Sequence, residues 1–338
     1  MDPAAADLWQ QAERRGGMTA FAQDMADHGS CSPRRDLRSR QTESMSRSAV
    51  VVLDGGMSNA LEDRGHDLGG ALWTARLLRD APGEIAAVHR AYFAAGAQVA
   101  TTVSYQASVE GFIRLGLSHS AAEALICRSV LLAREVRDDL ASDGAKRLVA
   151  ASVGPYGAAL ADGSEYRGRY GVPAVRLRDF HLPRLELLAS AGPDLMAIET
   201  IPDLEEAEVL VELLDEIGLP AWFSYSAQRL KTRAGQPLDE AFRVAASAGS
   251  VVAVGVNCCV PGDVTAAVRL AIDNTGLPAV AYPNRGEAWD ATRRRWTGRD
   301  TFDATQVTAW VEAGAQYVGG CCRVGPADIA ALAHTVVR

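Results

Sequence analysis

From Ser48 to the C-terminus, short apolar runs alternate with longer segments whose apolar residues recur at helical spacing. A short apolar run bounded by turn residues is typical of a buried strand, and its alternation with helical segments is typical of βα units around a parallel sheet. We expect strands at 49–53, 97–102, 147–153, 194–199, 220–225, 251–256, 278–282 and 315–318. We expect helices at 82–95, 119–142, 174–191, 203–217, 237–248, 262–273, 303–313 and 326–337.

Eight strands in alternation with eight helices predict an α/β fold of the (β/α)8 TIM-barrel type. A doubly wound open sheet is the rival, but that fold usually carries a glycine-rich fingerprint after its first strand, and Asp54-Gly55-Gly56 is not that fingerprint. The chain has 338 residues, and barrels of about 250 residues or more form one unit. We therefore expect residues 48–338 to form a single barrel domain.

Residues 1–47 differ from the rest of the chain. Their charge is mixed, they contain no strand-like run, and residues 30–35 have the composition of a loop. Such segments cannot bury enough apolar surface to offset the loss of chain entropy. We expect this stretch to be a disordered N-terminal extension.

Composition excludes several classes of partner. The formal net charge is -8 and the pI is near 5.4, which argues against nucleic acid or an anionic membrane surface. No apolar stretch approaches the ~20 residues needed to cross a bilayer, and the acidic first thirty residues do not resemble a secretory signal. Four of the six cysteines form two adjacent pairs, which favours a cytoplasmic metal site over a disulfide framework. A monomer is the default expectation.

Polar residues gather where the predicted strands end. In a barrel these ends carry the chemistry, because the βα loops converge there. Asp54 and Glu199 could bind substrate, cap a helix or pair with an arginine, and Asn257 and Asn284 could contact substrate or close turns. Gly55 permits a tight backbone and, as a second possibility, close approach of a substrate.

Three cysteines end two of the predicted strands. Cys258 follows the sixth strand, and Cys321 and Cys322 follow the eighth, so their thiols can converge. Three thiolates suit one Zn²⁺ ion in tetrahedral geometry, with the fourth position open to water or substrate. A redox disulfide between Cys321 and Cys322, or simple burial, remains an alternative. Cys259 should point away from such a site, because adjacent side chains diverge.

Taken together, the strand ends resemble the homocysteine S-methyltransferase family. The similarity covers the chain from about Ser48 onward, and the stretch 152–171 resembles the bacterial and plant branch that uses S-methylmethionine. The segments that carry it are DGGMSNALEDRG at 54–65, TTVSYQAS at 101–108, SVGPYGAALADGSEYRGRYG at 152–171, ETIP at 199–202, GVNC at 255–258, YPNRGE at 282–287 and GGCCR at 319–323.

The resemblance implies roles for individual residues. Cys258, Cys321 and Cys322 would be the zinc ligands and thereby the catalytic residues. Asp54 and Glu199 would hold the amino group of homocysteine, helped by backbone near Gly55. The implied reaction moves a methyl group from S-methylmethionine, or S-adenosylmethionine, to homocysteine and yields methionine. Selenocysteine is an alternative acceptor, and Arg285, which departs from the family pattern, is expected to alter the donor pocket.

A sulfonium donor should lie near aromatic rings, where cation–π attraction contributes ~0.5 to 2 kcal/mol. The aromatic candidates are Trp73, Tyr105, Tyr156, Tyr166 and Tyr170. Two other functional classes stay open at this stage. A zinc hydrolase would favour histidine and carboxylate ligands over three cysteines. A non-catalytic redox switch on Cys321 and Cys322 would need no metal.

Overall fold

The computed structural model describes residues 50–68, 73–290 and 295–336. Its parallel strands are β1 (Val51–Val52), β2 (Val99–Thr101), β3 (Leu148–Val153), β4 (Leu195–Ile201), β5 (Ala221–Gln228), β7 (Val251–Asn257), β8 (Ala279–Tyr282) and β11 (Ala315–Val318). They pair in the order β1-β11-β8-β7-β5-β4-β3-β2. A parallel bridge between Leu53 and Val99 joins β1 to β2, so the sheet curls into a barrel with this bridge as its seam.

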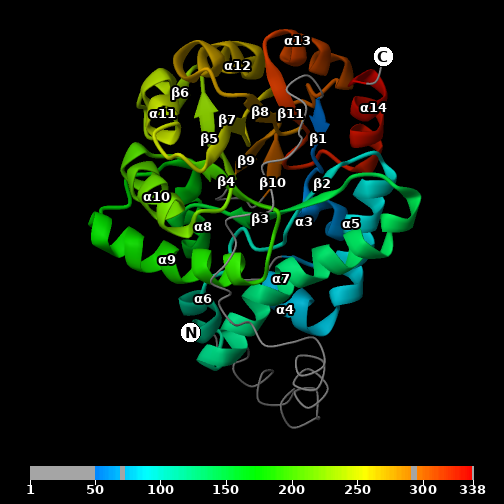
Figure 1. Cartoon of the computed structure of the whole chain (residues 1–338), viewed down its shortest axis with the longest axis vertical. Helices are drawn as coiled ribbons and strands as arrows, with labels where there is room; N and C mark the ends of the chain where they lie inside the picture. The colour runs from blue at the N-terminus through cyan, green and yellow to red at the C-terminus, as the bar shows by residue number, and fades with distance from the viewer. Residues whose placement is uncertain (1–49, 69–72, 291–294, 337–338) are drawn as a thin grey trace.

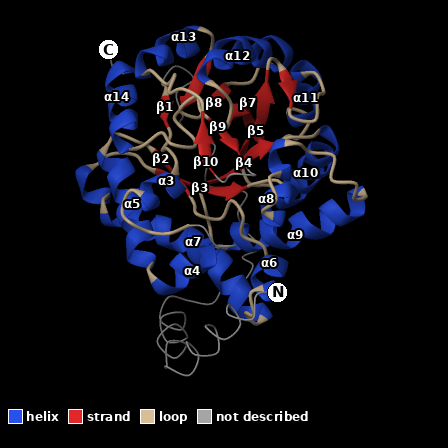
Figure 2. Cartoon of the chain, turned by 180° about the vertical axis from the view of Figure 1, so that it is seen from behind, coloured by secondary structure: helices blue, strands red, loops and turns tan. Residues whose placement is uncertain are grey.

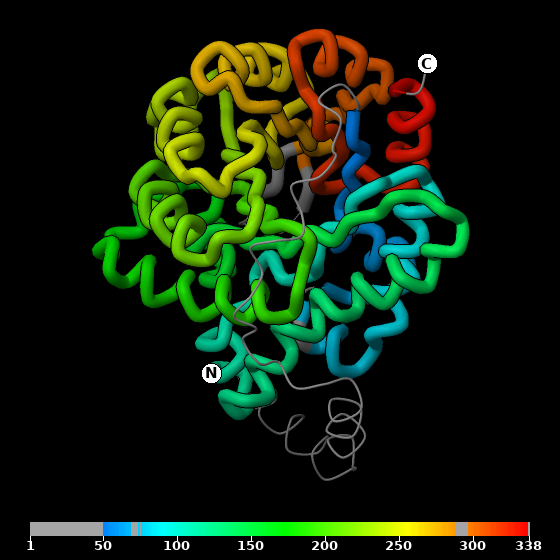
Figure 3. The backbone as a smooth tube through the Cα atoms, viewed as in Figure 1, coloured from blue at the N-terminus to red at the C-terminus, as the bar shows by residue number. Residues whose placement is uncertain are grey.

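Helices surround the barrel on its outside (Figures 1 and 2). The main helices that follow the eight barrel strands in turn are α5 (Pro82–Ala94), α7 (His119–Asp139), α9 (Ala174–Ser190), α10 (Leu204–Ile217), α11 (Leu238–Ala245), α12 (Pro261–Thr275), α13 (Val307–Glu312) and α14 (Pro326–Val336). This order confirms the predicted (β/α)8 TIM barrel. Figure 3 shows the first described strand beside the last part of the chain, where β1 pairs with β11.

Local sequence signals account for where several helices begin and end. The Asp203 carboxylate accepts a hydrogen bond from the Glu205 backbone N–H, 3.2 Å away, and so caps the start of α10. The helix α12 begins at Pro261, where the missing N–H costs nothing, and it ends at Gly276 with φ of 66°.

Two apolar layers hold the barrel together. The larger layer lies between the strands and the helices. The inner layer fills the barrel itself and is made by Val51, Leu53, Val99, Ala150, Leu195, Ala197, Trp222, Ala253, Val280, Tyr282 and Tyr317. Trp222 is fully buried, and its indole N–H donates to the Tyr282 hydroxyl over 2.9 Å. The barrel interior is therefore a packed core beneath the strand ends.

Gly255 shows how closely β7 and β8 approach each other. A Cβ atom at this position would lie 1.9 Å from the Val280 carbonyl oxygen. Only glycine fits such a contact without moving the backbone. The glycine two residues before Asn257 thus sets the position of the end of β7.

Short elements that the periodicity did not predict lie in the loops after the strands. They are α3 (Met57–Glu62), α4 (Trp73–Asp80), α6 (Val109–Arg114), α8 (Tyr156–Leu160) and the 3-10 turn η2 (Ser164–Tyr166). Two further pieces are the two-residue strand β6 (Lys231–Thr232) and the hairpin of β9 (Ala288–Asp290) and β10 (Arg295–Thr297). Most of them are too short to show a helical or alternating period.

The predicted N-terminal extension, 1–47, lies outside the described residues. Within the described ranges, no helix combines the length and the hydropathy that crossing a membrane requires.

His89 on α5 makes stability depend on pH. Its ring is fully buried, neither ring nitrogen has a hydrogen-bond partner among the described residues, and burial lowers its pKa to about 4. As pH falls below about 6.5, the unfolded chain binds a proton that the folded chain excludes, so the free energy of unfolding falls. We expect this residue to remove about 2 kcal/mol between pH 7.5 and pH 5.

The measurement is urea unfolding at both pH values for the wild type and for His89→Leu. The variant should show a smaller loss of stability on acidification by about that amount. His119→Gln, which changes an exposed histidine on α7, should keep the full loss. An unchanged pH dependence in His89→Leu would contradict the assignment.

Candidate active site and metal centre

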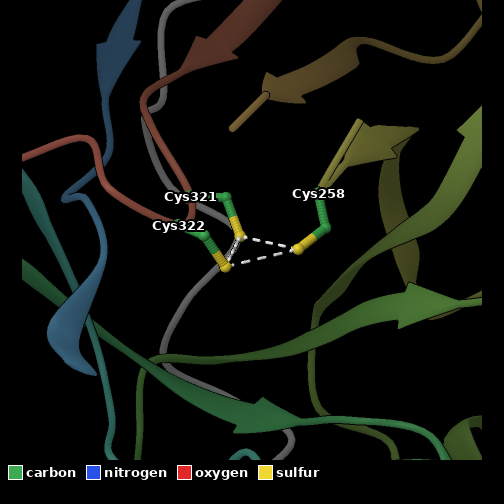
Figure 4. Close-up of side chains that lie close together, drawn as sticks. All are labelled: Cys258, Cys321 and Cys322. Atoms are coloured by element: carbon green, nitrogen blue, oxygen red, sulfur yellow. Dashed lines mark hydrogen bonds between the residues drawn. The ribbon is translucent and has the colours of Figure 1, made fainter. Parts of the chain in front are cut away.

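Three thiols converge at the carboxyl end of the barrel (Figure 4). Cys258 directly follows β7, and Cys321 and Cys322 lie in the loop after β11. The Sγ atom of Cys258 lies 3.2 Å from that of Cys321 and 3.7 Å from that of Cys322, and the latter two are 3.9 Å apart. Hydrogen bonds from these two thiols lower the pKa of Cys258. The three cysteines predicted as ligands are therefore brought together.

The spacing of the thiols suits a metal ion. With Zn–S bonds of about 2.3 Å, tetrahedral ligands lie about 3.8 Å apart, which is close to two of the three observed separations. Bonded sulfurs in a disulfide would lie about 2.05 Å apart, and all three cysteines are free thiols. The three thiols form a group that could hold one metal ion.

Two buried carboxylates share the same end of the barrel. Asp54 accepts hydrogen bonds from the Thr101 backbone N–H and hydroxyl, each over 2.7 Å. Glu199 on β4 accepts a hydrogen bond from the Ser152 hydroxyl. Burial raises the pKa of each carboxyl to about 7. Both groups would gain from a positively charged partner, which would favour their ionised forms.

Asn257 links the carboxylate side of the site to the thiols. Its side-chain Oδ1 accepts from the Thr200 backbone N–H over 2.7 Å, and its Nδ2 donates to the Thr200 hydroxyl over 2.8 Å. Thr200 and Cys258 both have left-handed backbone, with φ of 62° and 49°. Such strain in non-glycine residues persists only where neighbouring groups enforce it. Asn257 is fully buried and acts here as a brace between residues adjacent to Glu199 and Cys258.

The three thiols and the two carboxylates line one pocket of about 320 Å³, whereas Asn257 is not part of its lining. Its lining includes the three thiols, the two carboxylates, Thr101, Ser152, Thr200, Tyr282, Gly55, Tyr105, Tyr166, Glu165 and, from the first βα loop, Met57, Ser58, Asn59, Glu62 and Leu68. The volume lies at the lower end of the range for small-molecule sites. It has room for small polar molecules beside the thiols.

Of the aromatic candidates, Tyr105 and Tyr166 line the pocket. The Tyr166 hydroxyl lies 3.7 Å from the Cys258 Sγ atom. Tyr156 and Tyr170 instead pack edge to face, with ring centroids 5.4 Å apart, and do not belong to the lining. The side chain of Trp73 lies outside the described part of the structure.

The remaining candidates lie around the pocket. Gly55 lines it, and a Cβ atom there would lie 2.2 Å from the Val324 carbonyl oxygen, so glycine allows the loop after the thiols to close in. Asn284 is buried and donates its backbone N–H to the Cys259 carbonyl over 2.9 Å, without lining the pocket. The role of Asn284 as a substrate contact stays a prediction.

Arg285 does not reach the pocket, contrary to the expectation that it shapes the donor site. Its guanidinium contacts Asp300 and Asp328 and donates to the Arg323 carbonyl over 3.2 Å. Its backbone N–H donates to the Cys322 carbonyl over 3.1 Å. Arg285 therefore anchors the loop that carries Cys321 and Cys322.

A buried network fixes the loops on the opposite side of the pocket. Arg184 on α9 donates to the carbonyls of Gly154, Tyr105 and Ser104 over 2.9, 3.0 and 3.3 Å. Glu206 on α10 accepts from the Tyr170 hydroxyl over 3.0 Å and lies 2.8 Å from the His181 ring. Sequence reasoning did not single out this network, because no motif marks a buried arginine within a helix.

Comparison with known proteins agrees with this geometry. Residues 51–336 match the family model described as "Homocysteine S-methyltransferase". The chain is 44% identical to homocysteine S-methyltransferase 4 of Zea mays and 43% identical to homocysteine S-methyltransferase of Escherichia coli, covering 89% and 96% of those proteins and 85% of this chain.

Solved structures of a homocysteine methyltransferase also resemble this chain. The metallated form of the homocysteine methyltransferase MmuM from Escherichia coli superposes with a TM-score of 0.76 at 42% identity, over 84% of this chain and 96% of that one. The oxidised form of MmuM gives the same TM-score at 43% identity, over 84% and 94%. The family match over nearly all the described residues confirms the resemblance found in the sequence. This chain belongs to the homocysteine S-methyltransferase family.

Proposed function

We propose that the protein is a zinc-dependent homocysteine S-methyltransferase that uses S-methylmethionine as its methyl donor. The observation that carries the proposal is the convergence of three thiols and two buried carboxylates in one pocket. The family match and the metallated relative support the same reaction.

The thiol triplet would hold the zinc ion through Cys258, Cys321 and Cys322. When bound, zinc supplies the chemistry of a thiolate at neutral pH, because coordination deprotonates the sulfur of an incoming thiol. Asp54 and Glu199 would bind the ammonium group of homocysteine, and this charge would in turn favour their ionised forms. The acceptor would then be fixed at both its amino group and its sulfur.

Methyl transfer needs alignment more than acid–base chemistry. A bond forms between the homocysteine sulfur and the methyl carbon while the bond from that carbon to the sulfonium sulfur breaks. The electron pair of the broken bond stays on the donor sulfur, which leaves as a neutral thioether. The chain's task is to hold the two sulfurs in line with the methyl group and to keep water away.

The loop after β3 favours S-methylmethionine as the donor. The stretch 152–171 resembles the branch of the family that uses S-methylmethionine, and Glu165 and Tyr166 from this stretch line the pocket. We therefore expect S-methylmethionine to be the better of the two sulfonium donors.

The test is methionine formation by the zinc-loaded protein from homocysteine with each donor in turn. We expect turnover with both and a value of kcat/KM at least about tenfold higher for S-methylmethionine, because the loop after β3 resembles that of the branch that uses this donor. Selenocysteine in place of homocysteine tests the alternative acceptor. Absence of methionine with either donor would overturn the proposed function.

A further inference from the structure

Glu165 lies in the pocket but has no role so far in binding zinc or homocysteine or in transferring the methyl group. It lies in the turn η2, in the loop after β3, next to Tyr166. Glu165 lines the pocket, and its Oε2 atom is buried without a hydrogen-bond partner among the described residues. A buried carboxylate oxygen without a partner is costly, so its presence indicates that a partner arrives with a ligand.

The other carboxylates of the pocket already have partners. Asp54 accepts from Thr101, Glu199 accepts from Ser152, and the exposed Glu62 accepts from the Asn59 side chain over 3.0 Å. Glu165 is therefore the pocket carboxylate with the greatest unmet need for a positive charge.

The position of Glu165 identifies which charge it can meet. Glu165 lines the same pocket as the three thiols, and the neighbouring Tyr166 places its hydroxyl 3.7 Å from the Cys258 Sγ atom. The reacting carbon must come within about 3–3.5 Å of the acceptor sulfur, which would be held at the thiols. The positive sulfur of the donor, bonded to that carbon, would thus lie near the thiol cluster, in the pocket that Glu165 lines.

We propose that Glu165 is a specificity-determining residue whose carboxylate pairs with the positively charged sulfur of the sulfonium donor. The inference rests on the proposed function and deepens it by assigning the charge recognition of the donor. A neutral thioether gains nothing from this carboxylate, so the product is released more easily than the donor.

Loss of the Glu165 charge should affect KM for the donor more than kcat. The donor is positively charged in the ground state and loses that charge in the transition state, so a fixed carboxylate stabilises the ground state more. Replacing Glu165 by glutamine should therefore raise KM for the sulfonium donor about tenfold to hundredfold. The value of kcat should stay the same or rise, and KM for homocysteine should stay the same.

The experiment compares charged donors with a neutral analogue of the donor at saturating homocysteine and pH 8. S-methylmethionine and S-adenosylmethionine are the charged donors, and homoleucine, in which a carbon replaces the positive sulfur of S-methylmethionine, is the neutral inhibitor. In Glu165→Gln we expect KM to rise for both charged donors while the inhibition constant of homoleucine is unchanged. Thermal unfolding of each variant confirms that the fold is intact.

Asp162→Asn is the matched control. It removes the same charge from an exposed residue of the same loop, and the asparagine oxygen can still accept from the Ser164 backbone N–H. Its donor KM should stay within about twofold of the wild type, because exposed charges are screened. Glu165→Asp, which keeps the charge, should recover part of the lost donor affinity.

Two results would overturn the proposal. An unchanged donor KM in Glu165→Gln would show that the carboxylate does not meet the donor. A parallel loss of homoleucine binding would show that Glu165 binds the ammonium group, which both molecules carry. Failure of the proposed function would instead appear in the wild-type protein as absence of turnover.

Discussion

Replacing Cys258 by serine is expected to abolish metal binding and methyl transfer together. The serine hydroxyl remains protonated near neutral pH and is a poor ligand for a site built from sulfur. Zinc affinity should fall by at least about a hundredfold, since even changes outside the ligand set cost tenfold to hundredfold. The rate should fall by at least about a thousandfold, because the thiolate nucleophile is lost. The measurements are zinc per chain after dialysis and methionine formation.

Cys259 provides the matched control at the next position. It is buried in the outer apolar layer, and burial raises its pKa to about 12, so it behaves as a small apolar side chain. Cys259→Ala should keep one zinc ion per chain and at least half of the activity. Zinc retained in Cys258→Ser, or lost in Cys259→Ala, would show that the ligand set is wrong. Metal-free wild type that zinc does not restore would favour the redox switch on Cys321 and Cys322.

Of the substitutions proposed here, Arg184→Met should cause the largest decrease in the free energy of unfolding. Arg184→Met removes the donor to three carbonyls in the loops after β2 and β3. A buried acceptor left without a partner costs about 1–3 kcal/mol, so we expect the free energy of unfolding to fall by about 3–5 kcal/mol. In a barrel of this size 1 kcal/mol shifts the midpoint of thermal unfolding by less than about 2 °C, so we expect the midpoint to fall by about 5–8 °C.

The comparison is with Arg178→Met on the same helix. Arg178 forms an exposed ion pair with Glu216, at 2.7 Å, and such pairs contribute little. Its unfolding midpoint should change by less than about 3 °C. Equal effects of the two substitutions would show that the buried network does not hold the loops. Because Tyr105 belongs to one of those loops, Arg184→Met should also raise the KM of a substrate in the pocket.

The barrel could be predicted from the sequence because its signal is repeated. Each expected strand overlaps an observed one, and each expected helix overlaps a helix that follows a barrel strand. The site was predictable to the extent that strand ends specify it. Cys258 follows β7 directly, and Asp54 and Glu199 lie within two residues of the ends of β1 and β4, and the topology brings these strand ends together.

The rest depends on contacts that no local pattern encodes. The left-handed backbone of Thr200 follows from hydrogen bonds to Asn257, which is distant in sequence. Glu165 lies in a motif that the resemblance included, but its importance rests on burial without a partner, which only coordinates reveal. The short helices after the strands are specified by packing against the barrel and not by their own periodicity.

The hydrogen bonds between Asn257 and Thr200 also make the site sensitive to the length of the acceptor's side chain. These hydrogen bonds tie Thr200, next to Glu199, to Asn257, next to Cys258, so the distance between the Glu199 carboxylate and the Cys258 thiol is restrained. On the proposed function, an acceptor must span a fixed gap with its own methylene groups. Cysteine and selenocysteine are each one methylene shorter than homocysteine, so each would reach either the carboxylates or the thiol cluster but not both. A missing methylene weakens binding of the transition state by about 1–3 kcal/mol. The rigid contact between Asn257 and Thr200 would thereby help the enzyme to select homocysteine over shorter amino acids.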